Sequence, residues 1–157
     1  GIPMDDIYSD FWEVFLAETE TEQTAMVSRY TYFGRSEEES VAVLEQLLSG
    51  EKTASSHCIP DYLTKKQPMP RIGDYTMVTD FYGNPCCILK AVDVLIAPLP
   101  EVPEHWMQRE HPGVTPEAWL SEKHGEYEAL AARGGFHANE ENPVLLEQVQ
   151  VVYPVKA

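Results

Sequence analysis

The segment Gly50-Glu51-Lys52-Thr53-Ala54-Ser55-Ser56 follows a well-marked helix and begins an extended stretch rich in hydroxyl groups. Side chains alternate between the two faces of a β-strand, so an extended segment places Thr53 and Ser55 on one face. Lys52 lies at the junction, where its long side chain can reach back over Ser55. An amine beside a hydroxyl is the minimum apparatus for Ser-Lys nucleophilic chemistry. The alternative is structural, because the helix dipole alone favours a lysine just after a helix C-terminus.

The helix before this segment has clear start and stop signals. Ser36 and Glu39 have the spacing of a capping box, and Gly50 is the expected C-terminal cap. Apolar residues follow at core spacing: Val41, Leu44, Leu47 and Leu48. Earlier in the chain, Ser9 is the expected cap of a helix over 11–16, whereas residues 26–33 fit no single element.

After the segment, the sequence alternates between loops and β-structure. Three prolines predict a long loop over 57–70. Residues 75–79 are rich in strand-forming side chains, 82–85 form a turn, and 86–99 are a long apolar β segment. We therefore expect a hairpin in this region.

The last third of the chain predicts two helices and a closing strand. A short helix is expected over 102–109, and Thr115 followed by Pro116 begins a second helix that continues to about residue 132. Residues 144–155 alternate as a strand does. This order of elements is typical of an α+β domain built around a small barrel with flanking helices.

Length and composition indicate one soluble globular domain. The chain has 157 residues, of which 43% are hydrophobic and 24% charged. We interpret residues 1–4 as the remnant of a tag followed by the natural start, and residues 5–157 as a single domain with an N-terminal helical extension. No apolar run is long enough to span a membrane, and no signal peptide is visible. The three cysteines, Cys58, Cys86 and Cys87, indicate reduced thiols in a bacterial cytoplasmic protein.

The charge balance limits the possible partners. Eleven basic and 26 acidic residues give a net charge of −15, which excludes duplex DNA and makes any long polyanion a poor partner. Four basic residues nevertheless fall within 20 positions: Lys52, Lys65, Lys66 and Arg71. They form either a local patch for a small polar or anionic ligand, or an ordinary solvated loop.

Four motifs in order resemble the ASCH domain family of the PUA-like superfamily. They are the segment 50–55, Pro70-Arg71-Ile72-Gly73-Asp74-Tyr75, the turn 80–85 and the region 102–119 around Glu110. Together they extend over most of the chain. The resemblance implies a small PUA-like β-barrel with helices packed on it and a cleft. In the family, that cleft is associated with RNA-related binding, ribonuclease activity or hydrolysis of N(4)-acetylcytidine.

The small bacterial acetylcytidine amidohydrolases use a lysine, a hydroxyl three residues later and a distant glutamate. By position these fall on Lys52, Ser55 and Glu110, with serine in place of the usual threonine. Thr53, Tyr62, Lys66 and Arg71 are candidate ligand contacts. Tyr62 is either a stacking partner for a ligand ring or an ordinary half-buried loop tyrosine, and Lys66 and Arg71 either bind a phosphate or are exposed loop cations. Larger relatives have an acidic run where this chain has Glu110 to Val114, and that departure affects the identity of the substrate.

Amide hydrolysis through Ser55 requires a base. A neutral Lys52 with a pKa near 7 or 8, about 3 units below normal, could take this role if it were buried. Glu110 would then either pass protons to the leaving amine or position Lys52. There are two alternatives. One is a binding module for RNA or a nucleotide-linked partner, without catalysis, and the other is a ribonuclease using Lys52 and Tyr62.

Trp106 and Trp119 are expected in the core. The five histidines lack metal-ligand spacing, so we expect neither a metal nor another cofactor.

Overall fold

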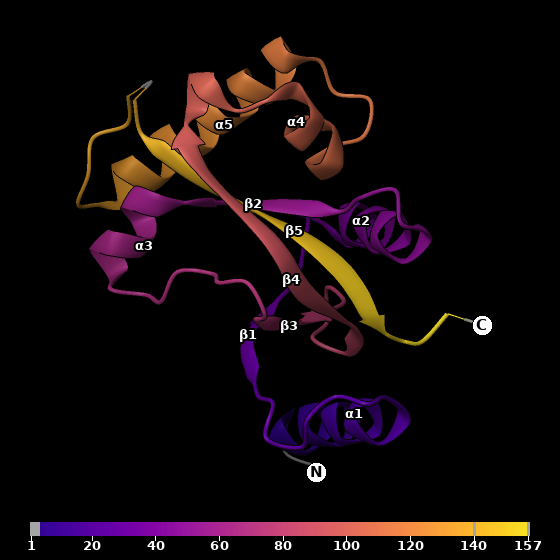
Figure 1. Ribbon diagram of the computed structural model, residues 1–157. Coiled ribbons are helices and arrows are strands. Elements are labelled where there is room, and N and C mark those ends of the chain that lie inside the picture. The colour runs from indigo at the N-terminus through magenta and orange to yellow at the C-terminus, as the bar shows by residue number, and fades with distance from the viewer. Residues whose placement is uncertain (1–3, 140, 157) are drawn as a thin grey trace. The chain divides into compact units, whose positions relative to one another are not determined.

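A computed structural model describes residues 4–139 and 141–156 (Figure 1). The proposed tag residues 1–3 therefore lie outside the described chain. The chain divides into two compact units, and its long strands β4 and β5 run from one into the other. The first unit comprises Gly1–Gly50, Gly73–Lys90 and Gln150–Ala157, and the second comprises Glu51–Ile72 and Ala91–Val149.

Five strands form one mixed sheet, hydrogen-bonded in the order β1-β3-β4-β5-β2. Their bounds are β1 Val27–Thr31, β2 Ala54–Cys58, β3 Tyr75–Thr79, β4 Pro85–Pro98 and β5 Pro143–Tyr153. Strand β1 pairs with β3 in parallel, whereas β3 pairs with β4 and β2 with β5 in antiparallel fashion. The expected hairpin is thus formed by β3 and the long strand β4, which Figure 1 shows as one continuous arrow. Residues 26–33, left unassigned from the sequence, contain β1.

The first unit contains two helices, α1 (Met4–Glu18) and α2 (Glu37–Ser49). The prediction that Ser9 caps the first helix is wrong, because Ser9 lies more than one turn inside α1. The apolar pattern already includes the half-buried Ile7, so the helix extends past the expected start. The caps of α2 are confirmed: Ser36 Oγ accepts from the Glu39 N–H at 3.2 Å, and Gly50 has φ of +83°.

The second unit contains α3 (Ile59–Lys65), the short 3-10 helix η1 (Leu99–Glu101), α4 (Glu104–Glu110) and α5 (Pro116–Arg133). The predicted loop over 57–70 is wrong in its first part, where β2 ends and α3 begins. Pro60 lies in the first turn of α3, where its missing N–H and fixed φ suit a helix. The two predicted helices near 102–109 and 115–132 are confirmed as α4 and α5. Figure 1 shows α4 beside α5, and α4 also packs against β2.

Each unit has its own hydrophobic core. In the second unit Trp106 and Trp119 are buried among residues of β2, β5, α4 and α5, which confirms their expected core positions. In the first unit α1 packs Phe15 and Leu16 against Ile88 of β4. The three cysteines are free thiols, as expected. Within the described residues, the helices are too short or too polar to cross a membrane.

Candidate functional site

The Lys52 side chain is buried in the second unit, and residues of α4 and β5 hold the segment that carries it. Its side chain is only 4% exposed, and its Nζ donates to the backbone carbonyl oxygen of Glu110 at 2.8 Å. The next residue, Thr53, donates its N–H to the Arg109 carbonyl at 2.8 Å, and its own carbonyl accepts from the Val149 N–H at 2.8 Å. The C-terminal end of α4 and strand β5 therefore fix the segment that carries Lys52.

The carboxylate of Glu110 lies at the centre of a buried polar cluster. Its Oε1 accepts from the Trp119 indole N–H at 2.7 Å and from the Lys123 ammonium at 2.9 Å. Its Oε2 accepts a short hydrogen bond from the Ser56 hydroxyl. Glu110 and Lys123 are 4% and 2% exposed, respectively. Both helices of this region thus contribute to the site, α4 through its last residue and α5 through one buried face.

Burial and neighbouring charges determine the protonation of this cluster. Burial lowers the pKa of the Lys52 amine from 10.5 to about 8, and the attraction of Glu110 only partly opposes it. Burial alone would raise the pKa of Glu110, but the ammonium groups of Lys123 and Lys52 outweigh it and bring that pKa to about 2. Burial also disfavours the Lys123 ammonium, yet the adjoining Glu110 carboxylate raises the pKa of Lys123. Near neutral pH, Glu110 and Lys123 are therefore a buried ion pair beside an amine that loses its proton easily.

Ser55 belongs to a second chain of hydrogen bonds. Its hydroxyl donates to Glu147 Oε1 of β5 at 3.2 Å, and the same oxygen lies 2.7 Å from His57 Nε2. His57 Nδ1 is in turn 2.8 Å from the Tyr62 hydroxyl on α3. Ser55 and Glu147 are direct partners in the antiparallel register of β2 and β5. The nucleophile predicted from the sequence therefore bonds a carboxylate, which the His57 imidazole contacts in turn.

The structure thus groups the predicted catalytic residues differently from the expected triad. Lys52 contacts Glu110, but the carboxylate of Glu110 bonds Ser56, whereas Ser55 bonds Glu147. The reason is the alternation of β2, which directs consecutive serines to opposite faces.

The predicted ligand residues are spread over the same unit. Tyr62 joins the chain that contains Ser55, and Thr53 anchors the segment through its backbone. Lys66 ends α3 with φ of +56°, and both it and Arg71 are exposed. Of the basic cluster, Lys65 forms an ion pair with Asp61 at 3.0 Å.

Four site residues were not predicted from the sequence: Ser56, His57, Lys123 and Glu147. A signal existed for Lys123, because it follows Trp119 by four residues and precedes Tyr127 by four, so it shares their buried helix face. Glu147 gave no comparable signal, since its place depends on the register between β2 and a strand about 90 residues away.

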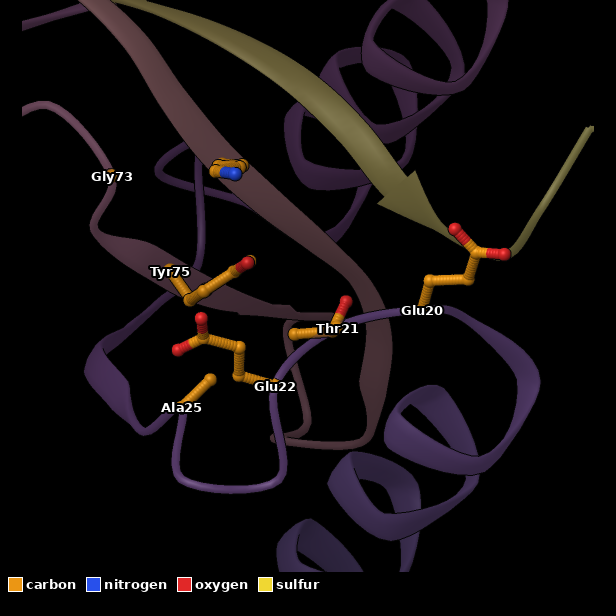
Figure 2. Close-up of a pocket in the computed structure, with 7 residues that line it drawn as sticks. Glu20, Thr21, Glu22, Ala25, Gly73 and Tyr75 are labelled. Carbon is orange, nitrogen blue, oxygen red and sulfur yellow. The ribbon is translucent and has the colours of Figure 1, made fainter.

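A separate pocket of about 560 Å³ lies in the first unit. Figure 2 shows its lining side chains, which include the carboxylates of Glu20 and Glu22 and the ring of Tyr75. The Lys90 amine lies 5.7 Å from the centre of that ring. This pocket contains none of the residues predicted from the sequence to act on a ligand. Across residues 4–139 and 141–156, no group of three or more His, Cys, Asp or Glu side chains is arranged to hold a metal ion.

Comparison with known proteins assigns the chain to a family. The ASCH domain model matches residues 28–153, so the protein belongs to the ASCH domain family. This family has a PUA-like fold, for which RNA-binding and hydrolase roles have been proposed. No curated protein matches the sequence.

Two crystal structures have similar folds. An ASCH domain from Lactobacillus crispatus JV V101 is 27% identical, with a TM-score of 0.79 over 94% of this chain and 95% of its own. A protein from Enterococcus faecalis V583 is 23% identical, with a TM-score of 0.80 over 95% of this chain and 89% of its own. The α+β, PUA-like fold class is confirmed.

Proposed function

We propose that this ASCH protein hydrolyses a small amide, such as an acylated nucleoside, with Ser55 as nucleophile and Lys52 as base. The observation that carries this proposal is the buried Lys52 amine. A pKa of about 8 leaves about one amine in ten neutral at pH 7, whereas a normal lysine is almost entirely protonated. Ser-Lys chemistry requires the amine to come within hydrogen-bond reach of the hydroxyl, and Lys52 precedes Ser55 by three residues in the same fixed segment.

Glu110 has the role of holding Lys52. With a pKa of about 2 it stays ionised at neutral pH, so it is unsuited to donating a proton to the leaving amine. Its backbone carbonyl accepts from Lys52, and its carboxylate ties α4 to α5 through Lys123 and Trp119.

The reaction balances with these two residues alone. The Ser55 oxygen forms a bond to the acyl carbon and its proton passes to the Lys52 amine. The carbon–nitrogen bond then breaks, and the leaving nitrogen takes the proton from the Lys52 ammonium. Water hydrolyses the resulting ester and restores the serine hydroxyl.

Glu147 is a second group able to accept the Ser55 proton, since its carboxylate already accepts that hydrogen bond. The two acceptors can be separated by mutation. Loss of the base in Lys52→Ala stops the reaction if the lysine is required, and Glu147→Gln stops it if the carboxylate is required.

The test is turnover of N(4)-acetylcytidine by wild type, Lys52→Ala and Ser55→Ala, followed by separation of cytidine. We expect each variant to lose a factor of about 10² to 10⁴ in rate, as for removal of a positioned nucleophile or base. Ser121→Ala is the control, because it removes an exposed hydroxyl of α5 in the same unit, whereas Ser56 bonds the Glu110 carboxylate. Equal turnover in wild type, Lys52→Ala and Ser55→Ala contradicts the proposed roles.

The charges of the second unit favour a small ligand over a long RNA. Lys52 is buried, and Lys65 forms an ion pair with Asp61. A non-catalytic RNA-binding module would have to rely on exposed basic residues such as Lys66. Binding to single-stranded oligonucleotides with a steep dependence on salt would support that alternative.

The contact between Tyr62 and His57 favours a second candidate activity, ribonuclease cleavage. A tyrosine hydroxyl and an imidazole 2.8 Å apart supply an acid and a base for attack by a 2′-hydroxyl. Digestion of a defined RNA by wild type, Tyr62→Phe and Lys52→Ala tests this activity. Loss of RNA cleavage in Tyr62→Phe supports it, and acetylcytidine turnover by the same variant measures whether amide hydrolysis also depends on the tyrosine hydroxyl.

A further inference from the structure

Two lysines approach one glutamate in the interior of the second unit, and they contact different parts of it. Lys123 Nζ lies 2.9 Å from the Glu110 carboxylate, whereas Lys52 Nζ lies 2.8 Å from the Glu110 backbone carbonyl oxygen. The carboxylate also accepts from Trp119 and Ser56. Its acceptor positions are therefore largely taken by groups other than Lys52.

This division has a consequence for the charge on Lys52. A carboxylate facing a buried amine stabilises the ammonium form, but a carboxylate neutralised by another cation does so far less. Lys123 lowers the pKa of Lys52 in two ways: it offsets the charge of Glu110, and it adds a like charge close to Lys52. A second cation nearby is a known way to make a lysine amine a usable base or nucleophile.

Several other charged groups act on Lys52. Besides Glu110 at the end of α4 and Lys123 on α5, they include His111 after α4 and the two carboxylates Glu122 and Glu126 on α5. Glu126 Oε2 lies 3.5 Å from Lys123 Nζ, and Glu122 Oε1 lies 3.4 Å from His111 Nε2. Both carboxylates are thus next to another basic group. The Glu110 carboxylate has Lys123 Nζ at 2.9 Å and His111 Nε2 at 3.7 Å.

We infer that Lys123 is a positioning residue that keeps Lys52 available as a base, by occupying the Glu110 carboxylate and adding a second positive charge to the buried cluster. This inference rests on the proposed function for its catalytic meaning. The electrostatic coupling between the two lysines, however, can be measured without any substrate.

The experiment is an NMR titration of the Lys52 side chain in protein labelled at lysine, with the signal assigned from its absence in Lys52→Arg. We expect wild-type Lys52 to titrate near pH 8. Lys123→Met should raise the proton affinity of Lys52 at least tenfold, one pH unit, because the charge of Glu110 is then no longer offset by a second ammonium group. Lys123→Arg keeps the charge and should leave the titration close to wild type.

Lys65→Met is the matched control, since it removes an exposed lysine of α3 in the same unit. The inference is overturned if Lys52 titrates at the same pH in Lys123→Met and wild type. Thermal unfolding checks that each variant folds, and if Lys123→Met does not, Lys123→Gln replaces it in the comparison.

The pH dependence of acetylcytidine turnover separates the inference from the proposed function. Where both hold, the rising limb of the rate moves to higher pH in Lys123→Met by the same amount as the NMR titration. If the Lys52 titration shifts in Lys123→Met but wild type does not turn over acetylcytidine, the coupling between the lysines stands and the proposed substrate and reaction are contradicted. Turnover in wild type without an NMR shift in Lys123→Met contradicts the role of Lys123 alone.

Discussion

Glu110 is a buried carboxylate whose pKa is held at about 2 by the cations around it. It is buried, ionised and bonded to side chains of β2 and α5, while its backbone carbonyl holds Lys52. A buried charge is stable only while its partners remain, so removal of the carboxylate leaves the buried Lys123 ammonium without the counterion 2.9 Å away. The residue therefore links the stability of the second unit to the protonation of its candidate base.

Glu110→Gln should lower the free energy of unfolding at pH 7 by about 3–5 kcal/mol, the usual cost of breaking a buried ion pair. It should also flatten the acid side of the stability curve. The pKa of Glu110 is about 2 in the folded protein and about 4.5 unfolded, so its contribution is complete above pH 4.5. That contribution, about 3 kcal/mol at 1.36 kcal/mol per unit, is lost as the pH falls from 4.5 towards 2.

Chemical denaturation of wild type and Glu110→Gln at pH 7, 5 and 3 measures both effects. Glu128→Gln is the control, because it removes an exposed carboxylate from α5. An equal loss of stability between pH 5 and pH 3 in wild type and Glu110→Gln would show that Glu110 is not ionised as described.

At the scale of elements, β2 decides which hydroxyl faces which acid. Its antiparallel register with β5 sets Ser55 opposite Glu147, and its alternation turns Ser56 towards Glu110. A slip of one residue would exchange the two faces, so the register specifies the site as much as the side chains do.

Helix α5 positions Lys123 and Trp119, and the contribution of its N-cap to stability can be tested by mutation. Thr115 Oγ1 accepts from the Ala118 N–H at 3.2 Å, as an N-cap does. Thr115→Ala should lower the free energy of unfolding by about 1 kcal/mol, because that N–H loses its partner. Urea denaturation measures the change, with Ser121→Ala inside the same helix as the control. A cost no greater than that of the control would show that the cap is not needed.

The whole molecule carries a net charge of −15, and this charge affects stability as well as partners. Like charges repel in the compact state, and salt screens them, with a Debye length of about 30 Å at 0.01 M and about 8 Å at 0.15 M. We expect the melting temperature to rise by a few degrees between these two salt concentrations at pH 7.

Differential scanning calorimetry at several sodium chloride concentrations checks this expectation. At pH 5, near the sequence pI of about 4.6, the same salt series should have a smaller effect. A melting temperature that falls with salt at pH 7 would mean that attractive ion pairs dominate over the net repulsion.

Local signals were sufficient for the elements that have them. The capping box at Ser36, Gly50 at a left-handed position and Thr115-Pro116 each depend on neighbours within a few residues, and each was confirmed. The two wrong element predictions arose where the same residue type is typical of two different structures. Ser9 resembled a cap inside a helix that starts earlier, and Pro60 indicated a loop where it begins α3.

The sequence by itself determined the family, the α+β class and the segment that carries Lys52, because motif spacing and periodicity are properties of the chain. Only the tertiary structure decided that Glu110 bonds Ser56 rather than Ser55, and that Lys123 and Glu147 complete the two hydrogen-bonded clusters. Those contacts depend on strand register and on how α4 and α5 pack on β2. Such choices are made by burial and charge across distant parts of the chain, and no local pattern records them.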